Sequence, residues 1–198
     1  APRIDRIVVE VSPGEIRAVA FAGDEAWDIL FERPMGGAAP GDIYRARAGA
    51  AGPDGGRFFD LGDGGGGLAR RPRAGWTDGG YGLVQVVRGE AGDKGPRVTD
   101  RVWLEEGGVA ASLGASGPLA DRIEIARAIP RQKREDLRAN IAPHVPEGVA
   151  ARVALGSVDE DAVGAMAARL IERLRRLAAL GGSPRRAHAA SGEVGRLV

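Results

Sequence analysis

The sequence predicts an α+β protein with three consecutive parts along its 198 residues. Two observations predict this class. Short β-branched segments separated by Gly, Pro and Asp precede Pro118, as is typical of antiparallel sheets and small barrels. After Pro118 the chain changes to a helical pattern, and residues 131–142 are rich in Lys, Arg, Glu and Leu, which favour helices. We therefore expect a small antiparallel meander at 1–35, a β-barrel at 36–117 and an α/β subdomain with a long C-terminal helix at 118–198.

The meander is predicted from three β-branched stretches near the N-terminus. Residues 4–11 and 15–21 flank Ser12-Pro13-Gly14, which is strong turn chemistry and predicts a hairpin. Residues 26–31 follow the turn at Gly23-Asp24 and add a third strand. A sheet of this size is too small to be stable alone, so we expect it to need support from elsewhere.

The barrel is predicted from five short strands between Asp42 and about Leu113. Glycine clusters at 36–41, 52–56, 62–67 and 78–80 separate the first strands and indicate loops. In the fourth strand one face carries Gln85 and the other places Arg88 at a polar end. The alternation does not fix which face points inward.

The last part is predicted as helix, strand and helix. Residues 131–142 favour a helix, and 149–155 resemble a strand. Ser157 and Glu160 match a capping box, so a long helix is expected to start there and to end at Gly181-Gly182. Its apolar residues recur at three- and four-residue steps and predict one buried stripe: Val163, Met166, Ala167, Leu170, Leu174 and Leu177. The arginines at 173, 175 and 176 suit the negative end of a helix dipole.

Composition excludes several classes of function. The chain has no cysteine and only two histidines, His144 and His188, so disulfides, thiolate metal sites and a His-rich zinc site are not expected. The net charge is +1, so nucleic-acid binding would have to come from local basic segments. No apolar run approaches the length of a membrane helix. We expect a cytoplasmic protein with no membrane partner.

One segment resembles a known family. Residues 82–99, GLVQVVRGEAGDKGPRVT, are similar in order and spacing to a strand-loop-strand signature of the ribonuclease E/G family. The resemblance extends upstream to Asp42-Ile43-Tyr44 and to 58–62, FFDLG. It continues downstream to 121–124, DRIE, and to 146–148, PEG.

The resemblance implies an N-terminal piece of a split ribonuclease-H-like subdomain, an OB-fold barrel and an end-sensor-like region. In the family the last region recognises the monophosphorylated end of RNA. Phe58 and Lys94 match the family's RNA-contacting positions, and stacking of bases on aromatic rings beside cations is how such barrels bind single strands. The other candidate RNA-binding residues are Arg88, Arg70, Arg71, Arg73 and Trp76. Taken without the family, the residues themselves favour Phe58 as a core residue and Lys94 as a solvated turn residue. Trp76 is equally well explained as a plug of the barrel end.

The sequence departs from the family at several functional positions. Leu68 stands where the family has its second RNA-stacking aromatic, and the loop at 70–82 is shorter than the family's. The Arg-Thr pair of the end-sensing pocket becomes Ala154-Leu155, so we expect weak or absent sensing of a 5′ monophosphate. Arg152 shares a strand face with Ala154 but starts about 6–7 Å away.

No catalytic residues are predicted in this chain. The family's magnesium-binding carboxylates lie in a domain beyond the point where the chain stops at Val198. Magnesium is therefore expected only together with that domain, and no cofactor or metal site is expected here. Asp159, Glu160 and Asp161 diverge around a helix start. The acids at 60, 63 and 78 suit turns better than a metal site.

Three hypotheses follow. The first is a single-stranded RNA-binding protein or fragment without catalytic activity, similar to the N-terminal part of the ribonuclease E/G family. The second is the N-terminal portion of a magnesium-dependent endoribonuclease of RNA processing. The third is a protein-interaction module that has lost RNA binding, in which the open edge of the meander pairs with a partner or with a second copy.

Overall fold

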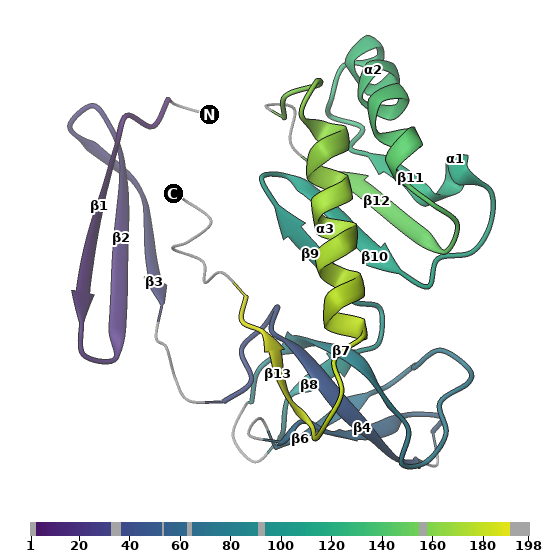
Figure 1. Ribbon diagram of the computed structural model, residues 1–198. Helices are drawn as coiled ribbons and strands as arrows, with labels where there is room; N and C mark the ends of the chain where they lie inside the picture. The colour runs from purple at the N-terminus through teal and green to yellow at the C-terminus, as the bar shows by residue number, and fades with distance from the viewer. Residues whose placement is uncertain are drawn as a thin grey trace.

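The computed structural model describes residues 3–32, 37–52, 54–62, 65–90, 94–154 and 158–190. These residues form a mixed α+β fold that consists mostly of strands, arranged in three sheets with few helices. Figure 1 shows the meander apart from the rest, the barrel at the bottom of the view and the α/β unit above the barrel. The predicted α+β class is confirmed.

The meander consists of β1 (Arg6–Ser12), β2 (Glu15–Ala22) and β3 (Glu25–Glu32), paired antiparallel in that order. The predicted turns connect them, and Gly14 and Gly23 adopt φ values of 83° and 64°, which glycine tolerates without steric cost. The third strand lies within one residue of the predicted bounds. The three-stranded meander is therefore confirmed.

The barrel consists of β4 (Ile43–Ala51), β5 (Arg57–Asp60), β6 (Gly66–Ala69), β7 (Tyr81–Arg88) and β8 (Arg97–Thr99). The strands follow the order β4-β5-β6-β8-β7, and pairing of β7 with β4 closes the ring. Only the β6–β8 contact among them is parallel. A closed five-stranded barrel is thus present, and its strand order is compatible with an OB-fold.

Alternating side chains fill the barrel interior. The buried residues are Ala38, Tyr44, Ala46, Ala48, Phe59, Leu61, Ala69, Val84, Val86 and Val98. Val84 and Val86 point into the barrel, so the face of β7 that carries them is the inner face and the face that carries Gln85 is the outer one. Leu83 instead packs against the core of the α/β unit. The side-chain amide of Gln85 donates through Nε2 to the Trp103 carbonyl oxygen at 2.9 Å and accepts through Oε1 from the Trp103 backbone N–H at 3.0 Å. The outer face of β7 at these two positions joins the barrel to the α/β unit.

The α/β unit contains four strands and two longer helices. Its strands are β9 (Trp103–Glu106), β10 (Val109–Leu113), β11 (Ile123–Ile125) and β12 (Val149–Val153), in the sheet order β11-β12-β10-β9. Its helices are α1 (Leu119–Arg122), α2 (Arg131–Ile141), the 3-10 turn η2 (Ala142–His144) and α3 (Val163–Ala178). Figure 1 shows α3 crossing one face of this sheet, and the apolar stripe of α3 is buried there as predicted.

Three features differ from the sequence prediction. The hairpin of β9 and β10 was expected in the barrel, but it pairs with β12 and belongs to the α/β sheet. The barrel strands therefore end at Thr99, well before residue 117. Helix α3 begins at Val163 with Ala162 as its N-cap and has no side-chain cap, so the predicted start at Ser157 is wrong. Ser157 itself lies outside the described residues.

The third difference is a strand after the last helix. The chain returns to the barrel as β13 (Arg185–His188), which pairs antiparallel with the first residues of β4. Strand β5 pairs only with the second half of β4, so β13 covers the rest of that edge. The buried carboxylate of Asp42 anchors this return, because it accepts hydrogen bonds from the Ala190 backbone at 2.9 Å and from Arg186 at 3.4 Å.

Candidate nucleic-acid interface

The outer face of β5 and β6 carries the sequence-predicted stacking residue. Phe58 is 58% exposed, between the inward-pointing Arg57 and Phe59. It therefore is an outward-facing residue and not a core residue. Leu68 lies directly opposite it on β6, half-buried. In OB-type barrels this second-to-third strand face is the part that holds oligonucleotides.

Two arginines lie on the strands beyond β6, one on β8 and one on β7. Arg97 on β8 pairs with Leu68, and Arg88 on β7 pairs with Arg97. Arg88 is exposed and Arg97 half-buried. Among the described residues neither guanidinium lies in an ion pair. Arg97 was missed by the sequence analysis, and its place two residues after Lys94-Gly95 was the only signal that could have found it.

Lys94 lies in the loop between β7 and β8, as predicted, and its side chain is exposed. The following residue, Gly95, packs on the backbone of Gly66, because a Cβ at Gly95 would lie 2.8 Å from the Gly66 carbonyl oxygen. The Pro96 carbonyl also accepts a hydrogen bond from the Leu68 backbone at 3.0 Å. These contacts hold the loop against β6 and place Lys94 beside the Phe58 face.

The basic loop after β6 divides into two parts. Arg70 and Arg71 are exposed and follow directly on β6. Arg73 is turned toward the α/β unit, where its guanidinium donates to the carbonyl oxygens of Leu113 at 3.1 Å and Gly114 at 3.2 Å. The structure therefore assigns Arg73 to the joint between barrel and α/β unit, and only Arg70 and Arg71 remain at the predicted interface.

Trp76 closes the barrel end. Its ring meets Phe59 edge-on with 4.8 Å between centroids, and its indole N–H donates to Asp100 Oδ2 at 2.8 Å. The ring also covers Gly82, where any side chain would collide with it. Trp76 is thus packed against the barrel core and does not form part of the exposed stacking surface, in agreement with its alternative role as a plug.

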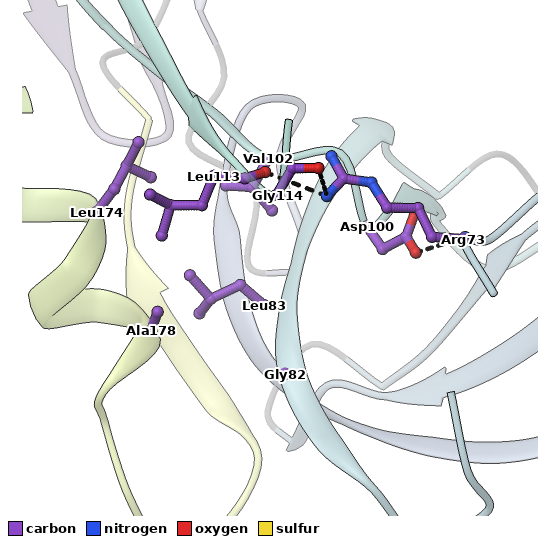
Figure 2. A pocket seen from close by; sticks show the side chains of 9 residues that line it. All are labelled: Arg73, Gly82, Leu83, Asp100, Val102, Leu113, Gly114, Leu174 and Ala178. Carbon is purple, nitrogen blue, oxygen red and sulfur yellow. Dashed lines mark hydrogen bonds between the residues drawn. The ribbon is translucent and has the colours of Figure 1, made fainter. Parts of the chain in front are cut away.

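A cavity of about 230 Å³ lies at this joint. Figure 2 shows Arg73 on one side of it and the apolar side chains of Leu83, Leu113 and Leu174 on the other. Asp100 Oδ2 accepts hydrogen bonds from the Arg73 backbone at 2.7 Å and from Trp76. The other carboxylate oxygen, Oδ1, is buried and has no hydrogen-bond partner in the described part of the chain. The carboxylate of Asp100 therefore holds the loop that carries Arg73 and Trp76 at the joint between the barrel and the α/β unit.

The face of the α/β sheet away from α3 carries the region matched to the end sensor. Arg152 stacks over the Trp103 ring at 4.9 Å and lies 3.9 Å from Glu105. Ala154 is exposed and Leu155 lies outside the described residues. A guanidinium engaged by a ring and a carboxylate is less available to a terminal phosphate. Weak or absent monophosphate sensing remains the prediction.

The acidic residues considered as metal ligands have other partners. Asp60 Oδ1 accepts from the Gly62 backbone at 2.8 Å and Asp78 pairs with Arg57 at 2.7 Å. Asp159 accepts from the Asp161 backbone at 2.9 Å, and Asp63 lies outside the described residues. Within the described ranges no three His, Asp or Glu side chains come together in a way that could hold a metal ion.

His188, the last residue of β13, has a shifted pKa. Partial burial lowers the pKa of His188 below its usual value, and the nearby charge of Arg173 lowers it further, while Asp42 acts in the opposite direction. Arg173 Nη2 lies 3.2 Å from His188 Nδ1.

None of the helices in the described residues is long and apolar enough to cross a membrane.

Fold and surface together define a mixed α+β protein, built on a closed five-stranded barrel with an exposed aromatic residue among cations. No protein-family model matches the chain, and no curated protein matches it. The resemblance to the ribonuclease E/G family therefore rests on the motifs in the sequence.

Proposed function

We propose that this protein binds single-stranded RNA on the outer face of its barrel, as a non-catalytic relative of the N-terminal part of the ribonuclease E/G family. The observation that carries the proposal is the exposure of Phe58 in the middle of a strand, beside Leu68 and next to Arg97 and Arg88. An apolar ring is costly to leave in water unless it has a partner there, and every nucleobase offers a stacking face.

The charge around Phe58 supports a nucleic acid as that partner. Arg97 lies on β8, which pairs with β6, and Arg88 lies on β7, the next strand beyond β8. Lys94 lies in the loop between β7 and β8, and Arg70 and Arg71 follow β6 itself. The whole chain is nearly neutral, so this concentration of cations is local. A base stacked on Phe58 would place its phosphates among these cations, and the release of counterions would then contribute to affinity.

The experiment is a fluorescence-anisotropy titration of a labelled single-stranded RNA. We expect Phe58→Ala to weaken binding about tenfold, because stacking of one base contributes about 1–3 kcal/mol. The matched control is Trp27→Ala in the meander, since Trp27 is an aromatic of nearly equal exposure, 60% against 58%. An equal loss of RNA affinity in both variants, or no loss of affinity in Phe58→Ala, would contradict RNA binding at the Phe58 face.

The ionic contribution is tested with Lys94→Ala across a salt series. One lost phosphate contact should reduce the slope of log Kd against log salt by about 0.7 on a single strand. The control Arg175→Ala removes an exposed cation of α3 and should leave the slope unchanged. The RNA is then examined on a gel with and without magnesium, because cleavage that a chelator abolishes would favour the endoribonuclease hypothesis.

A second candidate function, association through the meander, is favoured by a separate observation. Val8, Trp27 and Ile29 of the meander are each about half exposed, and β1 and β3 form its two edges. Edges of this kind pair with strands of other chains. A second copy of the chain is the partner we propose, and sedimentation velocity over a concentration series tests it. A single monomeric species at all concentrations would exclude it.

A further inference from the structure

A hollow of about 220 Å³ lies beside Phe58 on the outer face of the barrel. Arg47, Asp60 and Asp78 line it together with residues 48–50 and Gly79. One of its lining residues, Gly49, lies against Phe58, because a Cβ at Gly49 would lie 3.3 Å from the Phe58 carbonyl oxygen and 3.7 Å from its Cβ. The proposed RNA surface therefore extends into a recess on the β4 side of Phe58.

Two rows of outward-facing residues meet at this hollow. One row crosses the strands as Tyr81, Arg47, Asp60 and Gly66, each opposite the next. The other contains Phe58, two residues from Asp60 on the same face of β5. Such a step along a strand is about 6.7 Å, so a base next to Phe58 comes within reach of both Arg47 and Asp60.

The two charged groups of the first row retain hydrogen-bonding capacity. Arg47 is exposed, and no described carboxylate lies in an ion pair with it. Asp60 uses one oxygen to accept from the Gly62 backbone at 2.8 Å, and the second oxygen has no partner in the described part of the chain. Asp78, in contrast, is held by the buried Arg57 at 2.7 Å. The hollow thus offers one group rich in donors and one rich in acceptors.

We propose that Arg47 and Asp60 bind the edge of a guanine base in the RNA, an inference that rests on the proposed RNA binding of the Phe58 face. Guanine carries two adjacent donors, N1–H and N2–H₂, which match a carboxylate, and the acceptors O6 and N7, which match an arginine. Uracil has a single ring donor between two acceptors, and adenine lacks the paired donors. The carboxylate of Asp60, which has no cation paired with it in the described part of the chain, also disfavours a phosphate beside it, so a base fits the hollow better than the backbone does.

The experiment compares three labelled octamers: oligouridine, and the same strand with one central guanine or one central adenine. We expect the wild-type protein to bind the guanine strand about tenfold more tightly than either other strand, as one bidentate base contact would give. Asp60→Asn keeps an oxygen for the Gly62 backbone but presents an amide to the base. The Asp60→Asn variant should bind the guanine strand no more than about twofold more tightly than the other two strands, and its melting temperature should equal that of the wild-type protein.

The control is Asp121→Asn, which removes an exposed carboxylate of α1 and should leave the preference intact. Equal binding of all three octamers by the wild-type protein, or an undiminished preference in Asp60→Asn, would overturn the guanine site while RNA binding itself stands. Failure of the wild-type protein to bind any octamer would overturn the proposed function, and the guanine site with it.

Discussion

The meander and the barrel are built from similar antiparallel strands, but they bury their apolar side chains to different extents. In the barrel, Tyr44, Phe59 and Val84 are at most 2% exposed. In the meander, Trp27 is 60% and Ile29 53% exposed. The barrel closes through the β4–β7 pairing and so has an interior, whereas the meander has two faces and two edges. In the meander the small side chains of Ala18 and Ala20 on the central strand are buried, but large apolar side chains are buried only where the sheet closes or is covered.

The largest expected effect is the contrast between Phe59→Ala and Trp27→Ala. Removing the ring of Phe59 leaves a cavity inside the barrel and should lower the free energy of unfolding by about 3–5 kcal/mol. Removing the exposed ring of Trp27 should cost below about 1 kcal/mol. Urea denaturation measures both. A loss in Trp27→Ala as large as that in Phe59→Ala would mean that the meander is covered in solution.

A smaller effect is expected at the barrel end. Asp100→Ala leaves the Arg73 backbone N–H and the Trp76 indole N–H without their acceptor, which should cost about 1–3 kcal/mol. Asp100→Asn retains an oxygen and should recover much of that loss. Thermal unfolding followed by tryptophan fluorescence measures the stability of both variants. Equal stability of Asp100→Ala and Asp100→Asn would show that these hydrogen bonds do not hold the loop that carries Arg73 and Trp76.

A pH-dependent effect is expected where β13 joins the barrel. Because its folded-state pKa lies below the unfolded value near 6.5, His188 binds protons more readily in the unfolded chain. Its contribution to stability is fully present above about pH 6.5 and is lost as the pH falls toward the folded-state pKa. His188→Gln should remove this part of the pH dependence between pH 7.5 and about 5. Parallel stability profiles of variant and wild type would contradict the assignment.

The smallest effect is expected at the most exposed apolar residue of the meander. Val11 is 74% exposed, so Val11→Thr should change stability by less than about 0.5 kcal/mol. The matched change Val84→Thr places a hydroxyl inside the barrel and should cost more. Differential scanning calorimetry of the two variants gives the comparison, and a clear melting shift in Val11→Thr would indicate that β1 has a partner in solution.

Local signals in the sequence predicted the candidate interface only in part. Phe58 and Lys94 were found from a motif, and the alternation of β5 agrees with an outward Phe58. Arg97 was missed because it joins the interface only through the parallel β6–β8 pairing. Arg73 and Trp76 were assigned to RNA from their residue types, although their hydrogen bonds are with Leu113, Gly114 and Asp100, far away in the chain.

The sequence by itself determined the turns, the alternation of strands and the buried stripe of α3, because these depend on residues close together in the chain. Only the tertiary structure decided that β9 and β10 leave the barrel and that β13 returns to it. It also decided that Arg47 and Asp60 flank one hollow beside Phe58. Strand partners come from distant segments, and the same local pattern allows several of them, so pairing is settled by closure of the barrel and packing of its joint with the α/β unit.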